Sequence, residues 1–136
     1  MKLHTKTKYG IMALLFLAAA DTPVSIQEVS ISQQISERYL EAIFASLKKA
    51  KLIRSARGRN GGYQLTTTPG KLSLYDILTA LDQPMFYVPA QTEDALRLFL
   101  NQIVWTPASA AMIRYFQAVS LQDLREEELD NFMYYI

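Results

Sequence analysis

Residues 57–63 read RGRNGGY and place two arginines on a glycine-rich tip. The flanking segments 52–55 and 63–66, LIRS and YQLT, have the composition of short strands, and the glycines supply the positive φ angles that a tight connection needs. The stretch therefore predicts an antiparallel hairpin with a cationic tip. The surrounding window from Ala42 to Tyr75 contains seven lysines and arginines and no acid. Such a tip suits contact with a phosphate backbone.

Three helices are expected before the hairpin, over residues 7–20, 26–33 and from Ser36 to about residue 51. The spacing of Ser25 and Glu28 is that of a capping box, which begins the second helix. The third helix has one apolar face, formed by Tyr39, Leu40, Ile43, Phe44 and Leu47. The first is expected to bury Tyr9, Met12, Ala13, Phe16 and Leu17. A fourth helix is expected over residues 72–81, after a turn at 67–70.

The beginning of the chain allows a second interpretation. Three lysines precede the apolar run 11–20, which ends in three alanines, and this pattern also occurs in secretory signal peptides. The run is too short to cross a bilayer, which takes roughly 20 apolar residues. We expect a buried first helix and a cytoplasmic protein.

Charge divides the chain into two parts. Residues 1–83 carry eleven Lys and Arg against six Asp and Glu, whereas residues 84–136 carry three against seven. The first part suits a polyanion and the second does not. The chain has no cysteine and a single histidine, His4. No metal site, no iron–sulfur cluster and no disulfide is therefore expected, and no set of residues supports an enzyme.

The order helix, helix, helix, hairpin is that of a winged helix-turn-helix, so the predicted fold is mainly α with a small β-hairpin. Residues 1–83 would form a DNA-binding domain whose third helix enters the major groove. Arg38 and Glu41 would face bases, Arg57 and Arg59 the minor groove, and the lysines phosphates. The candidate DNA contacts are Lys6, Lys8, Tyr9, Ser36, Glu37, Arg38, Tyr39, Glu41, Lys48, Arg57, Arg59, Asn60, Gly61 and Gly62. The alternatives are a solvated lysine-rich face and a tight turn without a ligand.

Residues 84–136 are predicted to form dimerisation helices and an acidic, aromatic tail. One helix is expected over 93–104 and another over 107–118, with Thr106 as its N-cap and Pro107 at its first position. Only a brief turn is expected at 120–124. The apolar face of the second helix is broad, which favours a homodimer over packing within one protomer. The candidate contacts are Trp105, Met112, Ile113, Tyr115, Phe116, Val119, Leu121 and Leu124.

The chain resembles the IscR/NsrR/CymR family of bacterial winged-helix transcription regulators. The resemblance rests on KTKYG at 6–10, ISERYLE at 35–41, RGxxGGYxL at 57–65, and Val104-Trp105 followed by VSLQDL at 119–124. It implies a homodimer on palindromic operator DNA, more often a repressor. The alternative function is a dimeric interaction module or adaptor without specific DNA recognition.

The chain departs from the family between residues 85 and 102, where cluster-binding members place three cysteines. Here the segment is expected to be plain core; the alternatives are an extra helix that covers the dimer or an apolar pocket for a small effector. The resemblance to a cysteine-free branch adds that Tyr134, Tyr135 and Ile136 would dock into a metabolic enzyme. The alternative is that this tail folds back on its own dimer.

Overall fold

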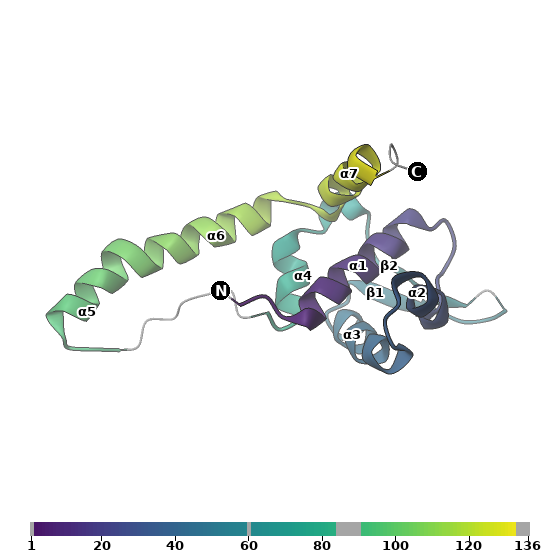
Figure 1. The fold of residues 1–136 in the computed structure, drawn as a ribbon, viewed down its shortest axis with the longest axis horizontal. Helices are drawn as coiled ribbons and strands as arrows, with labels where there is room; N and C mark the ends of the chain where they lie inside the picture. Colours follow the sequence, from purple (N-terminus) through teal and green to yellow (C-terminus); the bar gives the residue numbers. More distant parts are fainter. Residues whose placement is uncertain (1, 60, 84–90, 133–136) are drawn as a thin grey trace.

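The computed structural model describes residues 2–59, 61–83 and 91–132 and confirms the predicted order of three helices and a hairpin (Figure 1). The first helices are α1 (Thr5–Ala19), α2 (Ile26–Gln33) and α3 (Glu37–Lys49). Strands β1 (Ile53–Ala56) and β2 (Gly62–Leu65) pair antiparallel, with Ile53 opposite Leu65 and Ala56 opposite Gly62. The 3-10 turn η1 (Pro69–Lys71) then leads into α4 (Leu74–Ala80).

Serine caps set the beginnings of several helices. In α2 the predicted capping box forms, because Ser25 Oγ accepts from the Glu28 N–H at 3.1 Å and Glu28 Oε2 accepts from the Ser25 N–H at 2.7 Å. Ser36 Oγ accepts from the Tyr39 N–H at 3.2 Å and begins α3. A cap of this kind stabilises a helix by about 1 kcal/mol, so these serines mark where each helix begins.

The hydrophobic core joins all four N-terminal helices with the last helix of the chain. Its fully buried members include Leu14 of α1, Leu40 and Phe44 of α3, Ile77 of α4 and Leu121 of α7 (Leu121–Phe132). This arrangement confirms that the apolar run at 11–20 is a core helix. Among the described residues, no helix is long and apolar enough to cross a membrane.

The predicted buried face of α1 is partly wrong. The buried residues are Thr7, Gly10, Ala13, Leu14 and Leu17. Of the five that we expected, Tyr9, Met12 and Phe16 are only half-buried. The reason lies at Gly10, where an added Cβ would overlap the side chain of Leu81. Glycine lets α1 approach the end of α4 closely, and this approach turns Leu14 toward the core.

The hairpin gains a third partner that the sequence pattern did not predict. Val24 donates its N–H to the Tyr63 carbonyl at 2.9 Å and accepts from the Tyr63 N–H at 2.7 Å. Gly62 has a φ of 155°, and a Cβ there would lie 2.5 Å from the Val24 carbonyl carbon. Glycine is therefore required at this position for the close approach of two backbones.

The second half contains one long helix that extends away from the rest of the molecule (Figure 1). It consists of α5 (Ala95–Leu100), the wider π-helical turn η2 (Asn101–Trp105) and α6 (Thr106–Ala118). The predicted break at Thr106 is wrong, because Trp105 and Thr106 both have right-handed helical angles. The Thr106 N–H bonds to the Asn101 carbonyl, five residues back. Such a turn shifts the hydrogen-bond ladder just before Pro107, which has no N–H to donate.

The brief turn expected at 120–124 is also wrong, because α7 runs from Leu121 to Phe132. Ser120 and Asp123 form a capping box, with hydrogen bonds of 2.9 and 3.1 Å. The acidic residues 126–128 lie within this helix and not in a loop. Two backbone bonds dock its beginning onto the first half: Leu121 N–H to the Leu72 carbonyl and Leu74 N–H to the Val119 carbonyl, both 2.8 Å.

Candidate nucleic-acid interface

The N-terminal end of α3 presents polar side chains to solvent. Ser36, Glu37, Arg38 and Glu41 are all exposed. The opposite side of α3 is fixed by its four buried residues, so the helix cannot rotate these side chains away from solvent. Tyr39 is half-buried and packs edge-to-face on Tyr9 of α1, with ring centroids 5.7 Å apart. This contact gives both tyrosines a structural role in addition to the predicted DNA contact.

The cations around α3 are free to bind an anion. Among the described residues, the one ion pair within 4 Å joins Arg125 and Glu128, both on α7. Lys6 Nζ donates to Ser46 Oγ at 2.8 Å, and Lys48 Nζ donates to Ser55 Oγ at 3.2 Å. Hydroxyl partners orient an ammonium group without neutralising its charge. Lys8 is exposed and is likewise available to bind an anion.

The wing tip separates into residues that expose charge and residues that shape the backbone. Arg57 and Arg59 are exposed on either side of Gly58, which has a φ of 113°. At Gly61 a Cβ would lie 2.7 Å from the Ala56 carbonyl oxygen. Gly61, like Gly62, thus has a structural reason to be glycine, and the predicted DNA contact of both remains a prediction. Asn60, the other predicted contact, lies outside the described residues.

Arg59 also lies close to the beginning of α2. With Gly61 it lines a cleft of about 490 Å³ whose other wall is formed by Thr22, Pro23, Ser25 and Glu28. The wing and the helix-turn-helix thus meet at one surface. The position of Val24 in the sheet explains this proximity, since it fixes the start of α2 against β2.

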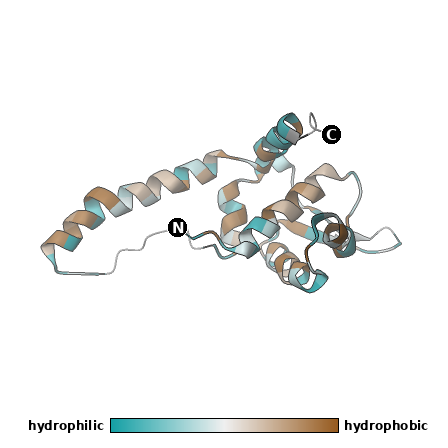
Figure 2. Cartoon of the chain, in the orientation of Figure 1, coloured by the Kyte–Doolittle hydropathy of each residue, from teal (hydrophilic) through white to brown (hydrophobic). Residues whose placement is uncertain are grey.

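The long helix α5–η2–α6 exposes a row of large apolar side chains. The exposed fraction is 67% for Leu96, 55% for Phe99, 61% for Ile103, 43% for Trp105 and 64% for Tyr115. In Figure 2 the apolar colour of this projecting helix is strongest at its α5 end, whereas α7 is mostly hydrophilic. The expectation that residues 96–100 are plain core is therefore wrong within one protomer. The segment follows a helical period of apolar residues, which does not by itself distinguish core from an interface.

The eight predicted dimerisation residues fall into two groups. Trp105 and Tyr115 are exposed, and Met112 and Ile113 of the same helix are half-buried. The others pack toward the protomer's own core: Phe116, Val119 and Leu124 are partly buried against it, and Leu121 is within it. Leu121 has no exposed surface, so its prediction as a contact with a second copy is wrong.

Leu124 lines an apolar groove between α1 and α7. Ile11, Met12 and Leu15 form the α1 wall of this groove, which has a volume of about 740 Å³. The exposed row on the long helix and this groove are separate apolar surfaces. Sequence reasoning did not name Leu96, Phe99 or Ile103 as interface residues, because their i, i+3, i+7 spacing marks one apolar helix face without saying what covers it.

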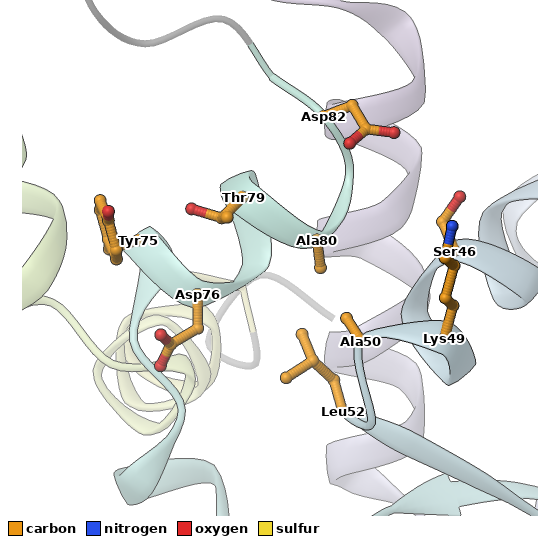
Figure 3. A pocket seen from close by; sticks show the side chains of 9 residues that line it. All are labelled: Ser46, Lys49, Ala50, Leu52, Tyr75, Asp76, Thr79, Ala80 and Asp82. Atoms are coloured by element: carbon orange, nitrogen blue, oxygen red, sulfur yellow. The ribbon is translucent and has the colours of Figure 1, made fainter.

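A cleft with both polar and apolar lining lies between α3 and α4. Its volume is about 500 Å³, and it is lined by Ser46, Lys49, Ala50, Leu52, Tyr75, Asp76, Thr79, Ala80 and Asp82. Figure 3 shows the small apolar side chains of Ala50 and Ala80 between the two helices, with Lys49 on the α3 side. This cleft lies outside residues 85–102, for which the sequence left open an effector pocket. Residues 84–90 are outside the described part of the chain.

A helix-turn-helix with a cationic, glycine-shaped wing defines a winged-helix DNA-binding protein. The family model described as "Iron-dependent Transcriptional regulator", the Rrf2 family, matches residues 3–127. The chain belongs to this family, and it is a DNA-binding transcription regulator. The family and its relatives are transcription regulators and not enzymes, which confirms the prediction that this chain is not an enzyme.

Named relatives agree with this assignment. Protein rrf2 of Nitratidesulfovibrio vulgaris is 33% identical over 133 residues, covering 93% of this chain and 89% of that protein. The regulator CymR of Bacillus subtilis is 28% identical, and the comparison covers 100% of both chains. The structure of CymR, the global cysteine regulator of B. subtilis, has a TM-score of 0.82 at 27% identity and covers 93% of this chain and 98% of its own. T. potens IscR has a TM-score of 0.78 at 28% identity, covering 99% and 97%.

The iron dependence in the family description does not fit the donor set of this chain. A thiolate-held iron centre needs cysteines, and the sequence has none and a single histidine. Among the described residues, no group of three or more His, Asp or Glu side chains converges on one point.

Proposed function

We propose that two copies of this chain form a homodimer that binds a palindromic operator and represses transcription by covering the promoter. Each protomer would place its α3 in one major groove, with the two half-sites about one helical turn apart. The cationic face around α3 and the wing would bind the DNA, and the exposed apolar row on the long helix would contact the second protomer.

The exposed apolar row on α5–η2–α6 is the observation that carries the dimer. The helix extends from the body, so the described part of the protomer leaves Leu96, Phe99 and Ile103 exposed. Large apolar side chains that are exposed together on one element are typical of an interface. A two-fold axis across the helix would bury the same row from both copies at once.

The reading of DNA would follow from the exposed end of α3 and the wing. Arg38 can donate two hydrogen bonds to guanine, and Glu41 can accept from a cytosine amino group. Arg57 and Arg59 would enter the minor groove, while Lys6, Lys8 and Lys48 bind phosphates. Because Arg38 and the wing arginines have no ion-pair partner among the described residues, they break no internal ion pair on binding.

The signal would act without a thiolate cluster. With no cysteine available, a small molecule is the simplest class of effector, and the cleft between α3 and α4 is one place that could hold it. A metabolic enzyme as a second partner rests on residues 134–136 alone, and these lie outside the described residues. Release of the operator DNA by a metabolite mixture would identify the small-molecule effector. Capture of a metabolic enzyme only by a chain that retains residues 134–136 would identify the second partner.

The deciding experiment is selection of genomic DNA fragments by the purified protein, followed by footprinting. We expect a palindrome whose half-sites are about one turn apart, and light scattering at twice the 15.5 kDa chain mass. Transcription in vitro from the bound promoter should fall as protein is added. Enrichment of no common sequence would favour the adaptor alternative, and a rise in transcript would refute repression at that promoter.

A further inference from the structure

Gln83 is a buried polar side chain that binds the N-terminal arm, which we define as residues 2–8 and which includes the first residues of α1. Only 5% of its surface is exposed. Its Oε1 accepts from the Thr7 hydroxyl at 2.7 Å and from the His4 backbone N–H at 3.0 Å. Its Nε2 donates to the Lys2 carbonyl at 2.8 Å. A buried amide is costly unless its hydrogen bonds are made, so this network favours one position of the arm.

The end of α4 fixes where Gln83 sits. Asp82 adopts left-handed angles, with a φ of 55°. The Gln83 N–H then bonds back to the Leu78 carbonyl at 3.0 Å, and the Asp82 N–H bonds to the Thr79 carbonyl at 3.1 Å. This is the usual hydrogen-bonded end of a helix. The amide that binds the arm is thus held by the hydrogen-bonded end of α4, some 80 residues further along the chain.

The arm lies beside α3, the helix that is proposed to enter the major groove. Lys6 Nζ donates to Ser46 Oγ of α3 at 2.8 Å, and the Tyr9 ring, next to Lys8, contacts the Tyr39 ring at the beginning of α3. The arm carries three lysines, of which Lys2 and Lys8 are exposed. Cations at this place would face the phosphates that flank the groove entered by α3.

We propose that Gln83 is a positioning residue for DNA binding, which holds the arm so that its lysines meet the phosphate backbone beside α3. The inference rests on the proposed operator binding and adds to it a residue that does not touch DNA. Replacement of Gln83 by methionine leaves the net charge unchanged. Any loss in the electrostatic part of binding would therefore report the position of the lysines and not their number.

The test compares Gln83→Met, Thr7→Val and Thr7→Ser with the unmodified protein, on a mixed-sequence duplex and on the selected operator. Moving one lysine away from its phosphate should lower the slope of log K against log salt by ~0.9. Because this effect vanishes near 1 M salt, affinity at about 0.1 M should fall roughly eightfold for each lysine displaced. Gln83→Met and Thr7→Val should show this loss, and Thr7→Ser, which keeps the hydroxyl donor, should not.

Ile77→Val is the matched control, because it removes one methyl group from the buried face of the same helix and no hydrogen bond. It should lower the melting temperature and leave the salt slope unchanged. An unchanged slope in folded Gln83→Met and Thr7→Val would overturn the inference, as would an equal loss in Ile77→Val. If Gln83→Met does not fold, Thr7→Val decides. A flat salt response of the unmodified protein would instead refute the proposed DNA binding itself.

Discussion

Truncation of Phe99 to alanine should weaken the proposed homodimer and leave the fold of the protomer intact. Phe99 lies on α5 with 55% of its surface exposed. Full burial of a phenylalanine contributes about 1.5–3 kcal/mol, so burial of that exposed part contributes about 0.8–1.6 kcal/mol. A two-fold interface contains the side chain twice, which brings the loss to about 1.6–3.3 kcal/mol per dimer. The dimer dissociation constant should therefore rise roughly 15- to 250-fold.

Sedimentation equilibrium over a dilution series measures this constant directly. Gln117→Ala is the control, because it truncates an exposed polar side chain near the other end of the same long helix. The helical circular dichroism signal and the chemical denaturation midpoint of the monomeric species should stay unchanged in both variants. If Phe99→Ala dimerises as tightly as the Gln117→Ala control, the exposed row is not the dimer interface and the reasoning fails.

Three further predictions test the corrected site and the wing. Leu121→Ala should destabilise the protomer by about 2–5 kcal/mol in chemical denaturation, because it empties a fully buried position. A free energy of unfolding equal to that of the unmodified protein would show that Leu121 is not a core residue. Gly62→Ala should destabilise the wing, because its Cβ would lie 2.5 Å from the Val24 backbone. Gly58→Ala is the comparison: its Cβ would meet nothing within 4 Å, so it tests the strain of a φ of 113° without a steric clash. Amide exchange at Tyr63 is the measurement, and protection as high in Gly62→Ala as in the unmodified protein would contradict the steric argument. Arg57→Ala should weaken operator binding by about 1–3 kcal/mol if the arginine reads the groove, with Lys71→Ala as a control for loss of a surface charge outside the proposed site; equal titrations of the two variants would exclude Arg57.

The N-terminal half could be predicted because its signals are local. A capping box at Ser25 and Glu28, a cap at Ser36 and a period of apolar residues in α3 each specify an element within a few residues. What could not be predicted is where distant segments approach. Gly10 allows the close approach of Leu81, and Gly62 allows that of Val24. In the sequence, a glycine shows only that a side chain is missing and does not indicate which distant residue approaches it.

The second half shows why a local rule can fail. Threonine followed by proline is typical of a helix start, yet the chain passes through Thr106 and Pro107 as a continuous helix. A single wide turn, whose formation depends on the ladder over residues 101–105, removes the conflict with proline. The prediction of which side chains are buried failed for a related reason. Leu121 and Tyr115 are both large hydrophobic residues of the second half, and only the docking of α7 onto residues 72–74 separates a core side chain from an exposed one.

The basic and acidic halves of the sequence place their charges on opposite sides of the molecule. Helix α1 contacts both α3 and α7, and Figure 1 shows it between them. The side with α3 and the arm carries cations that have no ion-pair partner within the described part of the chain, whereas α7 carries Asp123, Glu126, Glu127, Glu128 and Asp130 against Arg125 alone. A duplex approaching α7 would meet repulsion, and one approaching α3 would meet attraction, so the field orients the protein before contact. The net charge of +1 therefore understates the electrostatics of binding. Replacement of α7 carboxylates by amides should raise affinity for mixed-sequence DNA more than affinity for the operator, since it removes orientation without adding a base contact.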